Sequence, residues 1–269
     1  MAPVDSPRRT AYPATSVRYS SRMAIARPQT EELEILRDGE RIKAFAAWVK
    51  RDDRRPAVIL IHDVRGLSDH YRDIASRFAT AGFFALALDL YSREGTPELP
   101  DMDAVFRHMA ALDDRRVLRD IESAVRYLQI RPEVCSGSIG ITGFCMGGQY
   151  ALMAACSVPR LAACVSFYGM LRYTEKTPHK PESALEMAPR LHCPYLGLFG
   201  AEDQLIPRAD VKALESTLRK AGKTFKTKTY AGAGHAFFND ARPDAYRPAA
   251  ARDAWRRAVA FFRTHLGSH

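Results

Sequence analysis

The strongest constraint on the fold is a series of short apolar runs that alternate with amphipathic segments along the chain. The run at 57–61 is continuous and rich in β-branched residues, which is typical of a strand buried on both faces of a sheet. Comparable runs follow at 83–91, 137–142 and 193–200, and the segments between them carry apolar residues at helical spacing. This alternation predicts an α/β fold, in which helices cover both faces of a mostly parallel sheet.

The chain divides into two predicted parts. Residues 1–29 show no sustained periodicity and hold five arginines against one aspartate, so we interpret them as a basic arm. Residues 30–269 are predicted to form a single domain, which opens with an antiparallel hairpin of strands at 31–36 and 41–50. Helices are predicted from the apolar spacing at 69–82, 101–113, 115–130, 208–222 and 247–266.

Composition and charge argue against several classes of function. The net charge is +9, but over the folded part the excess is mild and spread out, whereas a nucleic-acid binder would gather it with aromatic residues on one face. The five cysteines form no CxxC pair and no metal-ligand spacing, so neither a disulfide framework nor a metal site is predicted. Because no apolar run approaches about 18 residues and no secretory signal is readable, we expect a cytoplasmic protein without a membrane span.

Three chemically reactive residues each come directly after a predicted strand. They are Cys145, Asp203 and His235, in that order along the chain. Because the carboxyl ends of parallel strands meet at one edge of a sheet, we expect these side chains to lie close together. The order is the nucleophile, acid and base order of the α/β-hydrolase fold. Glu202, beside Asp203, is an alternative acid.

The segment around Cys145 matches the pattern of a sharp strand-to-helix turn that carries a nucleophile. Gly143 and Gly147 occupy the two flanking positions, where larger side chains would collide. The dipole of the helix that follows favours a thiolate, and a histidine within reach accepts the proton. The backbone amides of Met146 and Val64 are predicted to form the oxyanion hole.

Several motifs together resemble those of the dienelactone hydrolase family: GFCMGG, HDVRG, DLYSR, GAEDQLIP and GHAFF. The similarity covers roughly residues 31–267. It implies an α/β-hydrolase fold that needs no cofactor, with Cys145 as nucleophile, Asp203 as acid and His235 as base. It also implies that Asp63 contacts the resting cysteine, at a position where the best-known bacterial members carry the longer glutamate.

The resemblance also predicts how a substrate carboxylate is bound. Arg93 matches the arginine that binds this group in the family, and a second arginine is expected where this chain has Asn239. We hypothesise that Arg65, near the same pocket mouth, supplies the missing charge. The expected activity is hydrolysis of a small ester or lactone by a monomer or homodimer, with no nucleic acid or membrane partner.

Two other functions remain open from the sequence. Asn239 favours a general carboxylesterase that acts on neutral esters. A non-catalytic binding protein on a hydrolase scaffold is the other alternative, although the complete set of Cys, Asp and His argues against it. Asp63 could instead be an ordinary surface turn residue, and Arg93 could be an ordinary solvated loop residue. Whatever the substrate, the segments at 101–130 and 172–190 are expected to roof the pocket.

Overall fold

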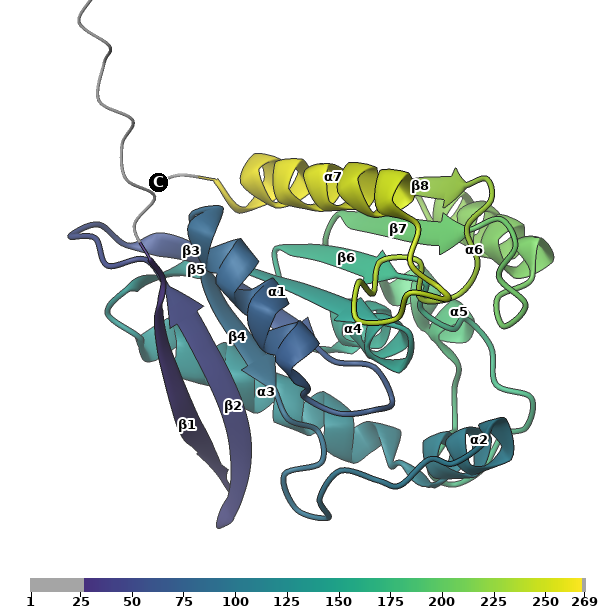
Figure 1. Cartoon of the computed structure of the whole chain (residues 1–269), viewed down its shortest axis with the longest axis horizontal. Coiled ribbons are helices and arrows are strands. Elements are labelled where there is room, and N and C mark those ends of the chain that lie inside the picture. The colour runs from purple at the N-terminus through teal and green to yellow at the C-terminus, as the bar shows by residue number, and fades with distance from the viewer. Residues whose placement is uncertain (1–26, 268–269) are drawn as a thin grey trace, which may run out of the picture.

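The computed structural model describes residues 27–267, and their strands form one eight-stranded sheet (Figure 1). Across the sheet the order is β1-β2-β4-β3-β5-β6-β7-β8. This arrangement confirms the predicted α/β fold. The predicted arm at 1–29 lies almost wholly outside the described residues. The strands are β1 (Gln29–Arg37), β2 (Glu40–Trp48), β3 (Arg55–Ile61), β4 (Phe84–Leu88), β5 (Val134–Phe144), β6 (Ala163–Phe167), β7 (Tyr195–Gly200) and β8 (Phe225–Tyr230).

An antiparallel hairpin forms one edge of the sheet, as predicted. Strands β1 and β2 pair antiparallel and are joined by Asp38 and Gly39, which have φ values of 51° and 83°. Two successive residues with positive φ are the signature of a tight hairpin turn whose twist suits the strands. Strand β2 pairs antiparallel with β4, and the neighbours from β4 through β3 and β5 to β8 are all parallel.

Helices cover both faces of the sheet. Helices α1 and α7 pack on one face, and α3 and α4 pack on the other (Figure 1). On that second face, α5 and the 3₁₀ turn that follows it pack against both α4 and α6. Helix α3 is capped at its N-terminus by Asp113, whose carboxylate accepts hydrogen bonds from the first free amides of the helix. The helices are α1 (Asp69–Thr80), α2 (Met102–Ala111), α3 (Asp114–Ile130), α4 (Met146–Ser157), α5 (Ala184–Met187), α6 (Arg208–Lys220) and α7 (Pro248–Leu266).

The central strands position the site. Residues 57–61 of β3 and all of β4 are fully buried, as expected for strands covered on both faces. The parallel register aligns Ile61 with Gly143 and Phe144 with Phe167. The loops that follow β3, β5 and β6 therefore leave the sheet side by side. Within residues 27–267, no helix combines the length and apolarity that crossing a membrane requires.

Candidate active site

A single residue makes the turn between the central strand and the helix behind it. Strand β5 ends at Phe144 and α4 begins at Met146, which leaves Cys145 between them with φ 55° and ψ −119°. This conformation is strained for any residue with a side chain. Its own backbone holds it: the Cys145 amide donates to the Phe167 carbonyl at 3.0 Å, and its carbonyl accepts from the Gln149 amide at 3.1 Å. The thiol is thereby fixed at the N-terminus of α4.

The flanking glycines allow this turn to fold. A Cβ atom on Gly143 would collide with the carbonyl group of Gly147. A Cβ atom on Gly147 would collide with the carbonyl oxygens at the end of β3, those of Ile61 and His62. Backbone therefore packs directly on backbone at both positions, which is the steric reason predicted from the sequence.

The imidazole of His235 is held by Asp203. His235 Nδ1 lies 2.8 Å from Asp203 Oδ2, and the aspartate side chain has no exposed surface. The other carboxylate oxygen accepts hydrogen bonds from the amides of Leu205 and Ile206, at 2.9 and 3.2 Å. Asp203, and not the neighbouring Glu202, is thus the carboxylate that orients the histidine.

The far nitrogen of His235 remains available. Within the part of the chain that the structure describes, Nε2 is buried and has no hydrogen-bond partner. Burial lowers the pKa of His235, but the charge of the Cys145 side chain and the bond with Asp203 outweigh it and raise the pKa to about 10. These influences favour an imidazolium at His235 at neutral pH.

The two predicted oxyanion donors, in the loop after β3 and at the start of α4, belong to residues that both contact Tyr91. Met146 is the first residue of α4, so no carbonyl within the helix can accept from its amide. The Tyr91 hydroxyl donates to the Val64 carbonyl oxygen at 2.9 Å and lies 3.7 Å from the Met146 sulfur. Buried His62 accepts a hydrogen bond from the Leu90 amide at 3.1 Å, which also links the loop after β3 to the loop after β4. The sequence analysis did not identify this position of Tyr91 between the two donors.

Asp63 shares the surroundings of the thiol. Its Oδ1 accepts a hydrogen bond from the Arg65 amide at 2.9 Å, and the residue is buried. Burial, together with the charges of Asp63 and Cys145, raises the pKa of Tyr91 and of Tyr168. The charges of Asp63 and Cys145 therefore both raise the pKa values of the same two tyrosines, Tyr91 and Tyr168. The predicted contact between Asp63 and the thiol stays a prediction.

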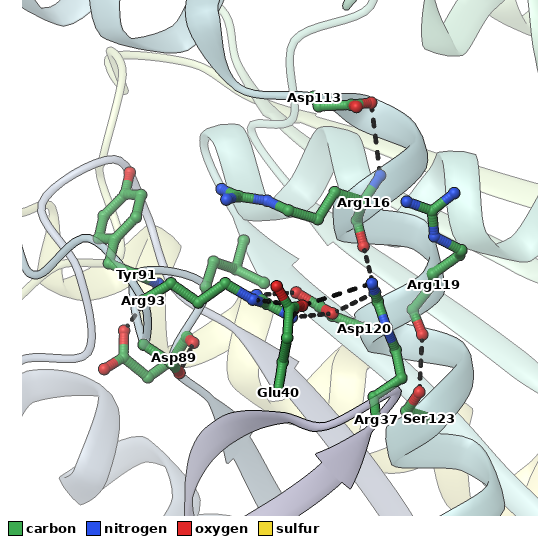
Figure 2. Close-up of polar contacts among 12 residues, drawn as sticks. Arg37, Glu40, Asp89, Tyr91, Arg93, Asp113, Arg116, Arg119, Asp120 and Ser123 are labelled. Atoms are coloured by element: carbon green, nitrogen blue, oxygen red, sulfur yellow. Dashed lines mark hydrogen bonds and ion pairs between the residues drawn. The ribbon is translucent and has the colours of Figure 1, made fainter.

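Arg93 lies in an ion-pair cluster between α3 and the hairpin (Figure 2). Its two terminal nitrogens bind Asp120 Oδ2 and Oδ1 at 2.8 and 3.0 Å, and its Nε donates to Glu40 at 2.7 Å. Arg37 binds the same, almost fully buried Asp120 at 2.7 Å. All three donor nitrogens of Arg93 have protein acceptors, so binding a substrate carboxylate would require breaking these pairs. The predicted role stays a prediction that this placement does not favour.

The remaining predicted residues lie in loops beside the site. Asn239 is buried, and its side-chain oxygen accepts from the Ala241 amide at 3.0 Å, closing a turn after His235. Arg65 is exposed on the loop after β3. Arg242, which the sequence analysis missed, follows three residues after Asn239, and its charge opposes the rise in the pKa of Tyr168. The family motif places the second arginine at the position of Asn239, so it could not indicate an arginine three residues later.

A cavity of about 370 Å³ opens beside the elbow. Helix α2 and the segment at 170–180 wall it, so part of each segment expected to form the roof lines this cavity, whereas residues 115–130 and 181–190 do not. Among residues 27–267, no cluster of three or more His, Cys, Asp or Glu side chains is suited to a metal ion.

Comparisons with known proteins identify the family of this chain. Residues 42–266 match the dienelactone hydrolase family. A Bradyrhizobium protein named "Probable 2-oxo-3-(5-oxofuran-2-ylidene)propanoate lactonase" is 37% identical over 234 residues, which cover 87% of this chain and 94% of that protein. A "Putative carboxymethylenebutenolidase" of Escherichia coli (strain K12) is 34% identical over 232 residues, covering 85% of this chain and 84% of that protein.

A solved structure shares the fold. The "Putative Dienelactone Hydrolase from Klebsiella pneumoniae subsp. pneumoniae MGH 78578" has a TM-score of 0.84 and 34% identity, over 88% of this chain and 99% of that chain. Sequence and architecture therefore agree along most of the protein's length. The chain is a hydrolase and belongs to the dienelactone hydrolase family.

Proposed function

We propose that this protein hydrolyses small esters or lactones with Cys145 as its nucleophile. The observation that carries the proposal is the strained elbow, which holds a thiol beside the half-buried His235, whose Nδ1 is bound to Asp203. The names of the relatives, a lactonase and a carboxymethylenebutenolidase, support this substrate class. Asp63 is proposed to help ionise the thiol from its buried position in the adjacent loop.

The first half of the reaction transfers the acyl group to sulfur. The Cys145 thiolate attacks the carbonyl carbon, and the carbonyl oxygen becomes an oxyanion that accepts from the Met146 and Val64 amides. When the intermediate collapses, the carbon–oxygen bond to the leaving group breaks. The departing alkoxide or enolate takes the proton from His235, which becomes neutral.

The second half releases the acyl group. Neutral His235 accepts a proton from water, and the resulting hydroxide attacks the thioester carbon. The carbon–sulfur bond then breaks, which regenerates the thiolate beside an imidazolium. Asp203 stabilises the imidazolium and keeps Nε2 directed toward the reacting groups.

Replacing the thiol tests the proposal. In Cys145→Ala, kcat for p-nitrophenyl acetate should fall by at least about 1000-fold, and the burst of one p-nitrophenol per protein molecule should vanish. Cys135→Ala is the matched control, because Cys135 is a partly exposed free thiol on the same strand. Unchanged hydrolysis in Cys145→Ala would falsify the proposal. A wild type without a burst or turnover would favour the non-catalytic binding protein.

A general carboxylesterase for neutral esters is the second candidate. Two observations favour it: Arg93 is occupied by Asp120 and Glu40, and Asn239 carries no charge. The discriminating measurement is the ratio of kcat/KM for p-nitrophenyl butyrate to that for p-nitrophenyl hemisuccinate. A ratio well above one supports the neutral esterase, whereas a ratio well below one supports an anionic substrate.

A further inference from the structure

The cavity beside the elbow follows one face of the helix that carries the nucleophile. Met146, Gln149 and Tyr150 line it, and their spacing of three and four residues places them on the same side of α4. Because Met146 directly follows Cys145, the cavity starts next to the predicted oxyanion hole. Its volume of about 370 Å³ suits one ring-sized substituent of a small ligand.

One buried acceptor in this cavity has no partner. Gln149 is 2% exposed, and within residues 27–267 its side-chain oxygen receives no hydrogen bond. A buried amide oxygen without a donor is costly, so a ligand donor that reaches this oxygen from the cavity would be stabilised there.

The neighbouring hydrogen bonds fix which way the Gln149 amide points. The Tyr173 hydroxyl donates to Asp114 Oδ2 at 2.7 Å, so its oxygen is free to accept. Gln149 Nε2 donates to that oxygen at 2.7 Å. Flipping the amide would place an acceptor against a hydroxyl whose proton is already committed to a carboxylate. The side-chain oxygen must therefore remain the unpartnered atom.

The two cationic side chains of the cavity wall are paired inside the protein. Lys180 Nζ lies 2.6 Å from Asp114 Oδ1 and donates to the Tyr150 hydroxyl at 2.8 Å. Arg172 binds Asp210 at 2.8 Å. An anionic substituent therefore finds no free counter-charge there, and it would also meet the exposed carboxylate of Glu175, which has no ion-pair partner within residues 27–267. The wall that remains is aromatic and thioether surface from Phe106, Met109, Met146 and Met170, which adapts well to flat rings.

We propose that this cavity binds an uncharged aryl arm of the ester, and that a hydroxyl or amide N–H on that arm donates to the Gln149 side-chain oxygen. The inference rests on the proposed ester hydrolysis and names its substrate class. The arm can belong to the acyl group or to the alcohol, and the chemistry of recognition is the same in both cases.

The volume of the cavity is tested by filling its exposed rim. Ala110→Trp adds a ring at a wall position of α2 that is exposed, so folding should be retained. We expect kcat/KM for ethyl phenylacetate or for benzyl acetate to fall about tenfold more than that for ethyl acetate, which has no ring. Arg107→Trp, an exposed neighbour outside the wall, is the control and should change none of the three. Equal losses for all three esters in Ala110→Trp overturn the proposal.

The donor is tested with hydroxyl and methoxy pairs of nearly equal size. One series uses p-nitrophenyl esters of 3- and 4-hydroxyphenylacetic acid and their methyl ethers, and the other uses acetates of the corresponding benzyl alcohols. In one series the hydroxyl compound should be hydrolysed about three- to tenfold faster than its ether, and Gln149→Leu should abolish that preference. The series that shows it identifies the arm. If neither series shows it in the wild type, the donor assignment is wrong, whether or not Gln149→Leu folds.

The outcomes separate this inference from the proposed function. If Cys145→Ala is inactive and the wild type ignores ring and hydroxyl, only the inference about the cavity fails. If the wild type hydrolyses no ester at all, the proposed function fails, and the cavity is then tested by the melting temperature with 4-ethylphenol or 4-ethylanisole. A larger rise with the phenol, lost in Gln149→Leu, supports the site, and equal shifts overturn it.

Discussion

Two clusters of buried charge lie behind the carboxyl ends of strands, and they differ in one respect. In the first, Asp203 binds one nitrogen of His235, and the other nitrogen has no partner within the described residues. In the second, all three donor nitrogens of Arg93 are bound by Asp120 and Glu40 (Figure 2). The first cluster keeps an atom free to exchange a proton with a substrate. The second has its donors occupied and joins the hairpin to α3.

The largest effect on activity is expected at the first cluster. Asp203→Asn keeps the size of the side chain but removes the charge that stabilises the imidazolium, so kcat should fall by about 10³- to 10⁴-fold. Stability should change far less, because the remaining oxygen can still accept from the Leu205 and Ile206 amides. Steady-state hydrolysis and urea unfolding measure the two effects. A variant that loses stability and keeps its kcat would contradict the comparison.

The opposite result is expected at the second cluster. Asp120→Asn leaves Arg37 and Arg93 without their shared buried counter-charge, and the free energy of unfolding should drop by about 3 kcal/mol. Glu40 still pairs with Arg93, which keeps the loss at this lower end. Activity per folded molecule on neutral esters should be nearly unchanged. Urea unfolding monitored by circular dichroism gives the measurement.

A matched control lies on the same helix. Glu122→Gln removes a carboxylate whose partner, Arg126, is 75% exposed, and it should lose no more than about 0.5 kcal/mol. Similar losses in Glu122→Gln and Asp120→Asn would mean that burial of the cluster does not matter. A selective gain of activity on anionic esters in Asp120→Asn, which releases Arg93 from one of its partners, would instead restore the role of Arg93 predicted from the sequence.

The pKa of His235 sharpens the comparison further. Its raised value means that the imidazole is protonated below about pH 10 and neutral above it. In Cys145→Ala the thiolate is absent, so burial is opposed mainly by Asp203 and the pKa should fall. Titration of the imidazole by NMR measures both proteins. A pKa that is the same in the variant would show that the thiol does not influence the histidine.

The smallest effect is expected at the hydrogen bond between Tyr91 and Val64, which holds the loop of one predicted oxyanion donor. Tyr91→Phe removes the hydroxyl that donates to the Val64 carbonyl but keeps the ring, so kcat should fall about three- to tenfold with KM little changed. Tyr230→Phe removes a hydroxyl that donates to Asp253 and serves as the control. If both variants lose the same activity, Tyr91 has no special part in positioning the loop.

The sequence predicted those parts of the site that depend on local pattern. Apolar runs located the strands, and the topology of parallel strands then brought Cys145, Asp203 and His235 to one edge. The two glycines predicted the elbow because their requirement is set within five residues. Here a local steric rule and a general topological rule were enough.

Other parts depend on contacts between distant residues, which no local pattern encodes. The partners of Arg93 come from positions 53 and 27 residues away, so its motif alone could not show that the guanidinium is already bound. The cavity at Gln149 depends on an irregular segment at 170–180, which has no periodicity to interpret. Strand β5 also begins at Val134, three residues before the predicted start, because pairing with β3 overrides the weak local signal.

The backbone of Cys145 has a consequence for how such a protein can change over time. A residue held at φ 55° and ψ −119° stores about 1–3 kcal/mol that the rest of the fold must offset. Glycine adopts this conformation without strain, so a Cys145→Gly variant should be more stable than the natural protein while lacking the thiol. Selection for stability alone would therefore favour replacing Cys145, and only selection for its proposed role as nucleophile would retain it.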